Sequence, residues 1–244
     1  MPMGSPWGLP KWAGAGRATW GDQPCRSLIA KRLGALAELT ELLHPSQMGG
    51  RAQKSAMDAS LLLLNNIQEQ RKLGRTTSTV FVDVKGAFDH IAHNRLLAVL
   101  QQLGFPLSFI SWTFAFLTDR LLRLSFDSKT ELFRQIAAGI SQGSPVSPIL
   151  LLIYIHSLFE PITNFTLSYM DDVAISASST SLKKNIRLLE KDVATLFGLG
   201  VPCAIQFDIA KTELIHFTTG KASLSTTLTL PDQTVVTTLR NKQT

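Results

Sequence analysis

The chain has 244 residues, of which 45% are hydrophobic and 17% charged, and this composition excludes a disordered protein. The length suffices for one large or two small domains with a sizeable core. The net charge of +6 fits a polyanionic partner, although many proteins of this charge bind no nucleic acid. Cys25 and Cys203 lack the spacing of a zinc site or a disulfide framework. The longest apolar run, residues 149–155, is too short for a bilayer span, so no membrane partner is expected.

The first half of the chain contains helical patterns followed by a strand pattern. Apolar residues recur with helical spacing over residues 25–43 and predict an amphipathic helix. Ser55 and Asp58 resemble a capping box and predict the start of a helix that ends near Gly74. Residues 79–84 form a β-branched and aromatic run, which is typical of a buried strand.

The second half of the chain alternates helix and strand patterns. Gly104 ends one helical segment, and Pro145 and Pro148 are well placed for the first turn of another. The predicted elements are a helix over 94–103, a helix after the two prolines, strands over 167–169 and 173–176, a helix over 181–197, and strands over 204–209 and 213–217 on either side of Lys211. Strands interleaved with helices predict an α+β fold.

Three aspartates stand at the ends of apolar strands. Asp83 closes the first strand, and Asp171 and Asp172 lie at the predicted hairpin tip. Adjacent carboxylates repel each other, and such a tip normally carries Asn-Gly or Asp-Gly. Carboxylate oxygens suit Mg²⁺, and two such ions about 3.5 to 4 Å apart can stabilise the attacking and leaving oxygens of a phosphoryl transfer. The alternative for each aspartate is that it only caps or ends an element.

Four segments carry a family resemblance. Residues 81–89 resemble the first catalytic motif of reverse transcriptases, and residues 139–148 resemble the Gly-rich turn that leads into their palm helix. Tyr169-Met170-Asp171-Asp172 resembles their Tyr-x-Asp-Asp box, and residues 209–213 are similar to the lysine motif that follows it. All four occur in the order of the family.

The flanks of these motifs indicate a subfamily. Residues 45–51 and 88–91 resemble enzymes of non-LTR (LINE-type) retrotransposons more than retroviral ones. The resemblance covers residues 25–218. It implies a truncated α+β reverse-transcriptase domain: a palm with an antiparallel sheet and packed helices, partial fingers, and a thumb that is largely absent. The expected division is a poorly ordered segment 1–24, partial fingers 25–78, a palm 79–218 with the catalytic motifs, and a short extension 219–244.

The resemblance also implies an activity. An RNA-directed DNA polymerase transfers deoxynucleotides to a primer 3′-hydroxyl by two-metal phosphoryl transfer, so the implied partners are an RNA template, a DNA primer and deoxynucleoside triphosphates. Asp83 and Asp171 match the main ligands of two Mg²⁺ ions, with Mn²⁺ as the alternative ion, and Asp172 matches a supporting ligand. Lys211 matches a proton donor to the leaving pyrophosphate, or else is a charged residue in a turn between strands.

Five further residues match positions that contact the nucleotide or the template. Phe88 matches the ring that excludes a ribonucleotide, with ordinary core packing as the alternative. Gln142 and Gly143 match the lining of the nascent base-pair pocket. Arg51 and Lys54 match fingers residues that reach phosphates, with solvated surface charge as the alternative.

Departures from the family pattern keep a rival function open. The family's Arg-Pro-Ile-Ser segment before the first helix is reduced to Pro24-Cys25-Arg26-Ser27, and the chain ends soon after the lysine motif. The rival is a catalytically inactive remnant that acts at most as a nucleic-acid-binding module. A third hypothesis, an RNA-dependent RNA polymerase, is disfavoured by the bulk of Phe88.

The LINE-type life cycle implies a nuclear location, but the chain shows no basic localisation cluster.

Overall fold

The computed structural model describes residues 23–118, 120–122, 125–126, 129–130, 134–135, 138–218 and 226–238. The chain forms two compact units that are each discontinuous in sequence. Unit 1 comprises residues 1–42 and 88–154, and unit 2 comprises residues 43–87 and 155–244. The predicted poorly ordered segment 1–24 lies, apart from its last two residues, outside the described residues. The predicted division into fingers, palm and extension stays a prediction.

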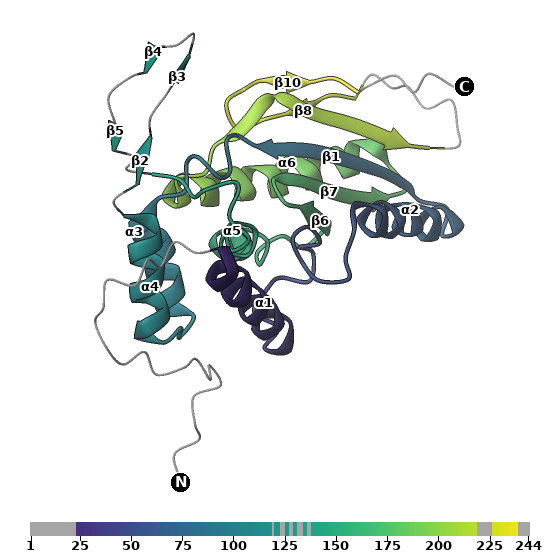
Figure 1. The fold of residues 1–244 in the computed structure, drawn as a ribbon. Helices are drawn as coiled ribbons and strands as arrows, with labels where there is room; N and C mark the ends of the chain where they lie inside the picture. The colour runs from purple at the N-terminus through teal and green to yellow at the C-terminus, as the bar shows by residue number, and fades with distance from the viewer. Residues whose placement is uncertain are drawn as a thin grey trace, which may run out of the picture. The chain divides into compact units, whose positions relative to one another are not determined.

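Unit 2 is built on a four-stranded antiparallel sheet with the strand order β6-β7-β1-β8 (Figure 1). The strands are β1 Thr76–Val84, β6 Phe165–Tyr169, β7 Asp172–Ser179 and β8 Phe207–Phe217. β1 is central and pairs with β7 on one side and with β8 on the other. The antiparallel sheet that the resemblance implies is confirmed.

One face of this sheet is covered by α6, Leu182–Gly200. The helix turns Leu189 and Val193, both 0% exposed, toward the strands, where Val80 and Ile175 are also 0% exposed. Burial of these side chains removes apolar surface from water and so stabilises the unit. The helix predicted over residues 181–197 is therefore confirmed, with its apolar side against the sheet.

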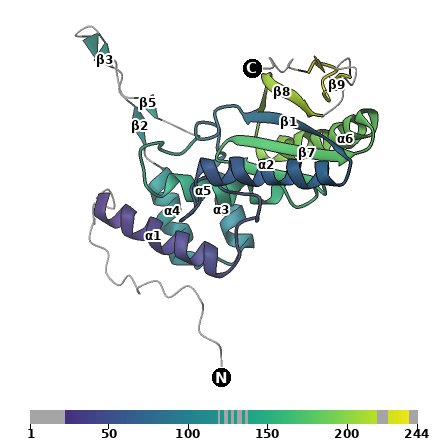
Figure 2. The ribbon, with the colours of Figure 1, turned by 90° about the vertical axis from the view of Figure 1, so that its right-hand side faces the viewer.

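A second helix, α2 Ala56–Lys72, packs against β1 and β6 and buries none of its residues (Figure 2). It begins at the predicted capping box: Ser55 Oγ accepts from the Asp58 amide, and Asp58 Oδ2 accepts from the Ser55 amide. The remaining elements of unit 2 are the 3₁₀ turns η1 His156–Leu158 and η2 Val201–Cys203 and the hairpin of β9 Leu228–Thr229 with β10 Val235–Val236.

The two strands predicted on either side of Lys211 are one continuous strand, β8, so the alternative that Lys211 lies in a turn is wrong. The error arises from a bulge. Phe81 is paired with Glu213 and Asp83 with Asp208, so four residues of β8 stand opposite the single Val82 of β1. A bulge interrupts the alternation from which strands are recognised in sequence.

A buried polar network lies between the sheet and α6. His216 is 3% exposed, and its Nδ1 is 2.8 Å from Ser78 Oγ while its Nε2 is 2.9 Å from Thr226 Oγ1. Asn185 of α6 donates its Nδ2 hydrogens to the Thr76 carbonyl at 2.8 Å and to Ser78 Oγ at 3.3 Å. Burial lowers the pKa of His216, which the Thr226 hydrogen bond only partly offsets.

This network predicts a pH-dependent stability. The unfolded chain binds the His216 proton more readily than the folded chain, so the free energy of unfolding falls as pH drops below about 6.5 toward the folded pKa. One such group changes it by at most about 1.4 kcal/mol per pH unit. Urea unfolding between pH 7 and pH 5 measures this slope, which H216Q is expected to reduce. An equal slope in both proteins would contradict the prediction.

Unit 1 contains the remaining helices and two small antiparallel strand pairs. The helices are α1 Gln23–Leu39, α3 His93–Gln102, α4 Leu107–Leu117 and most of α5 Ser147–Ile155; the pairs join β2 Leu121–Leu122 to β5 Arg134–Gln135 and β3 Ser125–Phe126 to β4 Lys129–Thr130. α4, which packs against α3, was not predicted. Within the described ranges, every helix is too short or too polar to span a bilayer.

Candidate active site

Three aspartates from three neighbouring strands of unit 2 stand in one row across the sheet. Asp83 of β1 is paired with Asp172 of β7 on one side and with Asp208 of β8 on the other. Directly opposite residues of antiparallel strands project from the same face. This face is the one opposite α6, because Val82, next to Asp83, is buried on the α6 side. Asp208 was not predicted, although it follows an apolar residue at a strand, as Asp83 does.

Asp171 lies in the two-residue turn that joins β6 to β7. Tyr169 is paired with Asp172, so Met170 and Asp171 form the turn between them. Met170 has a φ of 59°, a left-handed conformation that costs a side-chain-bearing residue free energy. The Asp171 carbonyl accepts a hydrogen bond of 3.0 Å from the Val84 amide. The turn is thereby tied to the strand that carries Asp83.

The loop before α2 packs directly against this turn. The Ser168 amide donates to the Ser46 carbonyl and the Met48 amide donates to the Ser168 carbonyl, both at 2.8 Å, so the loop pairs with the edge strand β6. A Cβ atom at Gly49 would lie 2.5 Å from the Met170 amide nitrogen. A side chain at position 49 is therefore excluded while the turn keeps its place. The sequence signal was the Gly49-Gly50 pair within residues 45–51, the segment that resembles the non-LTR enzymes.

Lys211 supplies the positive charge in the acidic row. Its Nζ lies 2.8 Å from Asp83 Oδ2 and 3.8 Å from Asp208 Oδ2. The hydrogen bond and charge of Asp83 raise the pKa of Lys211, so the ammonium form is favoured. The pKa of Asp172 is also raised, first by partial burial and then by the negative charges of Asp171 and Asp83, against which Lys211 acts.

The donor chemistry of the row fits a hard divalent cation. Carboxylate oxygens are the ligands that Mg²⁺ prefers. The pKa of Asp172 is raised by burial first and then by repulsion from Asp171 and Asp83, and a bound cation would relieve that repulsion. Within the described ranges, no three His, Cys, Asp or Glu side chains converge closely enough to form a ready metal site. The fit therefore rests on the type of donor and on the shared strand register, and the assignment of metal ligands stays a prediction.

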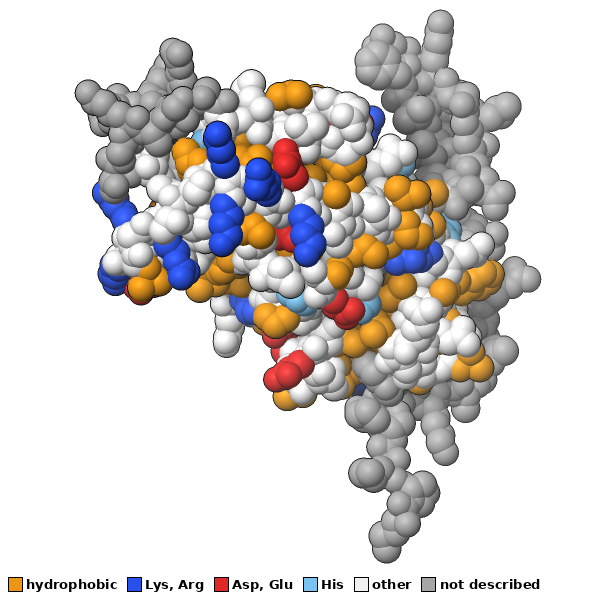
Figure 3. Space-filling model, turned by 180° about the vertical axis from the view of Figure 1, so that it is seen from behind, with side chains coloured by type: hydrophobic (Ala, Val, Ile, Leu, Met, Phe, Trp, Pro, Cys, Tyr) orange, Lys and Arg blue, Asp and Glu red, His pale blue; other side chains and the backbone are white. Residues whose placement is uncertain are grey.

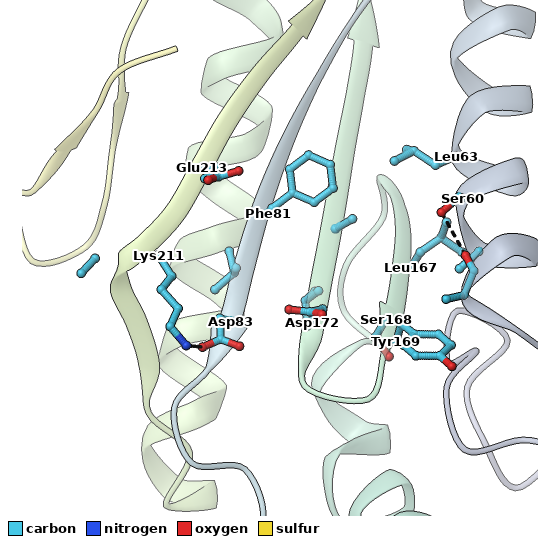
Figure 4. A pocket seen from close by; sticks show the side chains of 16 residues that line it. Ser60, Leu63, Phe81, Asp83, Leu167, Ser168, Tyr169, Asp172, Lys211 and Glu213 are labelled. Atoms are coloured by element: carbon cyan, nitrogen blue, oxygen red, sulfur yellow. Dashed lines mark hydrogen bonds and ion pairs between the residues drawn. The ribbon is translucent and has the colours of Figure 1, made fainter. Parts of the chain in front are cut away.

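A pocket of about 700 Å³ opens beside the row (Figure 4). Its walls come from α2 and all four strands of the sheet. Phe81 and Leu167 line an apolar part, and Asp83, Asp172 and Lys211 lie together toward one end. A cavity with an apolar wall and converging charged groups is the usual form of a site for a small molecule or a nucleotide.

The two predicted phosphate-binding residues of the fingers lie in unit 2. Arg51 is half-buried, and its Nη1 donates to the carbonyls of His44 at 3.3 Å and Gln47 at 3.1 Å. It therefore braces the loop that packs against the Met170-Asp171 turn. Lys54 is half-buried immediately before the capping box of α2. Phosphate binding by either residue stays a prediction.

The other predicted nucleotide-binding residues lie in unit 1. The Phe88 carbonyl accepts from the Ile140 amide at 2.7 Å, and Gln142 Nε2 donates to Asp89 Oδ1 at 3.2 Å. Gly139 allows the segment around residue 140 to approach residues 88 and 89 this closely. It has a φ of 79°, and a Cβ there would lie 2.7 Å from the Asp89 carbonyl oxygen. Phe88 is half-buried, whereas Gln142 and Gly143 are exposed. Two motifs that are far apart in sequence thus meet, and their roles toward a nucleotide stay predictions.

Comparison with known proteins identifies the family. The model of "Reverse transcriptase (RNA-dependent DNA polymerase)" matches residues 13–234. The chain therefore belongs to the reverse transcriptase family. It is 25% identical over 177 residues to the "Probable RNA-directed DNA polymerase from transposon BS" of Drosophila melanogaster, covering 69% of this chain and 19% of that protein. It is 34% identical over 125 residues to the "Retrovirus-related Pol polyprotein from type-1 retrotransposable element R2" of Popillia japonica, covering 50% and 17%.

These relatives confirm the predicted resemblance to the reverse transcriptases of non-LTR retrotransposons. The chain spans about a fifth of the length of the curated relatives it matches. Among solved structures, it resembles apo telomerase from Candida tropicalis with a TM-score of 0.61 and 11% identity, covering 88% of this chain and 40% of that chain. This likeness confirms the palm and partial fingers at the level of the fold.

Proposed function

We propose that the chain catalyses RNA-directed DNA synthesis, the transfer of deoxynucleotides to a DNA primer 3′-hydroxyl on an RNA template. The observation that carries the proposal is the acidic row with its ammonium group: Asp83 and Asp172 opposite each other, Asp171 in the adjoining turn, and Lys211 on Asp83. Membership of the reverse transcriptase family supports it. In phosphoryl transfer, the protein contributes mainly by positioning the reacting groups and by stabilising the charge of the transition state.

Asp83, Asp171 and Asp172 are the proposed ligands of the metal. Two bound Mg²⁺ ions, with Mn²⁺ as the alternative, would supply the positive charge that activates the primer hydroxyl and neutralises the triphosphate. Lys211 keeps a proton at Nζ because Asp83 raises its pKa, and we propose that this ammonium protonates the leaving pyrophosphate. The left-handed Met170 and the Gly49 contact hold Asp171 in place before substrate arrives.

The remaining predicted residues are proposed to select and hold the substrates. Phe88 would exclude a ribonucleotide by the bulk of its ring. Gln142 and Gly143 would face the nascent base pair, where the open space beside Gly143 leaves room for the template. Arg51 and Lys54 would contact phosphates of the triphosphate or the template.

The experiment is incorporation of labelled deoxynucleotides on an RNA template with a DNA primer in Mg²⁺, with Asp171→Asn beside the unaltered chain. Synthesis by the unaltered chain and none by the variant is expected, because the variant loses a negative charge at the proposed metal site. No synthesis by a folded unaltered chain would indicate the inactive remnant. Incorporation of ribonucleotides at an equal rate would indicate the RNA polymerase instead.

A further inference from the structure

The outer surface of α6 carries four basic side chains in one stripe. Lys183, Lys184, Arg187 and Lys191 are all exposed. Because each helical residue advances by about 100°, the four project within an arc of about 100° of the helix surface. The core side chains of the helix project from the opposite side. We call these four residues the α6 basic surface.

The acidic side chains of α6 do not neutralise this stripe. Glu190 Oε1 accepts a hydrogen bond of 3.1 Å from the Thr229 amide in the β9-β10 hairpin. Asp192 is 4% exposed, and its Oδ2 accepts from Asn164 Nδ2 at 2.7 Å. In the part of the chain that the structure describes, none of the four cations forms an ion pair. The α6 basic surface therefore presents uncompensated positive charge to solvent.

This surface lies on the far side of the sheet from the acidic row. α6 packs on the face of unit 2 opposite Asp83, and the view from behind shows Lys and Arg side chains gathered with few acidic ones among them (Figure 3). Beyond Lys191, the same arc of the helix continues with Ala194 and Gly198. No bulky side chain on this arc therefore blocks a long polyanion that extends past the C-terminal end of the stripe.

We propose that the α6 basic surface binds the phosphate backbone of an RNA strand, outside the acidic row and independently of base sequence. The stripe from Lys183 to Lys191 rises by about 12 Å along the helix, so its cations can contact successive phosphates of one strand. An RNA backbone repeats its charge along a line, as the stripe does. The choice of RNA as partner rests on the proposed function, in which the template must be held while the acidic row acts on the primer.

The test is the affinity for a short fluorescent single-stranded RNA, measured by anisotropy in EDTA without primer or nucleotide. The variant is Arg187→Gln with Lys191→Gln, since Gln removes the charge but keeps a similar helix propensity. Each lost phosphate contact removes about 0.7 from the slope of log K against log salt, which is about fivefold in affinity near 0.1 M salt. The double variant is therefore expected to bind about tenfold or more weakly, with a slope reduced by about 1.4.

The matched control is Lys31→Gln with Arg32→Gln, two exposed cations of α1, which lowers the net charge equally. An unchanged affinity and slope in the α6 variant would overturn the proposal, as would an equal loss in the control. If the α6 variant lost binding to phosphatidylserine vesicles but bound RNA as before, the surface would be assigned to anionic lipid. That result would also overturn the proposal that it binds RNA. This binding test does not depend on DNA synthesis. If the chain proved inactive in synthesis but the α6 variant still bound RNA more weakly, the proposed function would be refuted and this proposal would stand.

Discussion

Replacing Asp83 by Asn is expected to lower the rate of deoxynucleotide incorporation by about a thousandfold or more, the upper range for removing one preorganised electrostatic group. Asp83 stands in the middle of the acidic row, opposite Asp172 and Asp208, and accepts the hydrogen bond of Lys211. The amide loses the negative charge that a divalent cation requires. It also releases the Lys211 ammonium, so one substitution removes a proposed metal ligand and displaces the proposed proton donor.

Two measurements separate this effect from unfolding. The side chain of Lys211 is 65% exposed, and exposed ion pairs contribute little to stability, so the urea midpoint of Asp83→Asn should change little. Binding of Mn²⁺, followed by electron paramagnetic resonance, should weaken together with activity. Asp232→Asn, at an exposed turn of the β9-β10 hairpin, is the control and should retain both. Full activity of Asp83→Asn would refute the assignment of the metal site.

Replacing Gly49 by Ala is expected to reduce incorporation by about a hundredfold, although position 49 bears no chemical group. The new Cβ would lie 2.5 Å from the Met170 amide nitrogen and 2.8 Å from Met170 Cγ, and backbone at that distance must move. A shift of about 1 Å in a reacting group costs about this much in rate. Overpacking of this kind also costs about 1 to 3 kcal/mol of stability. Gly49 is thus a positioning residue for the turn that carries Asp171.

The expected signature is a fall in kcat with little change in KM, because the turn moves and the substrates still bind. Gly34→Ala is the matched control: it lies in α1, and a Cβ there meets no atom within 4 Å. That control should keep full activity and gain about 0.5 to 1 kcal/mol from the better helix propensity of Ala. The prediction would be contradicted if Gly49→Ala and Gly34→Ala incorporated deoxynucleotides at the same rate as the wild type. The turn would then tolerate a displacement of the loop.

Elements with strong local patterns were predictable from the sequence. The β-branched run over residues 79–84 became part of the inner strand β1, and the apolar side of the helix predicted over 181–197 became the inner side of α6. Ser55 and Asp58 formed the capping box that their spacing predicts. In each case the information lies within a few neighbouring residues, where propensity and periodicity act.

Features that depend on distant residues were not predictable in this way. α4 has apolar residues on all sides, so it shows no amphipathic period. The bulge of β8 is set by its pairing with β1, which also placed Asp208 beside Asp83. The contact of Gly49 with Met170 joins positions 121 residues apart in sequence, and no local pattern encodes it. The candidate site was thus predictable in its residue types but not in its supporting contacts.

The interrupted topology of unit 2 has a consequence for how the protein is made. β1 is the central strand, but Val84 and the first residue of its partner β7, Asp172, are 88 residues apart in the chain. At about 5 to 20 residues per second, a ribosome needs about 4 to 18 s to cover that distance. During this time a nine-residue, β-branched segment has both edges unpaired, the state in which strands associate with other chains. Nascent chains stalled within residues 88–171 should therefore aggregate or engage chaperones, whereas chains released beyond β8 should not.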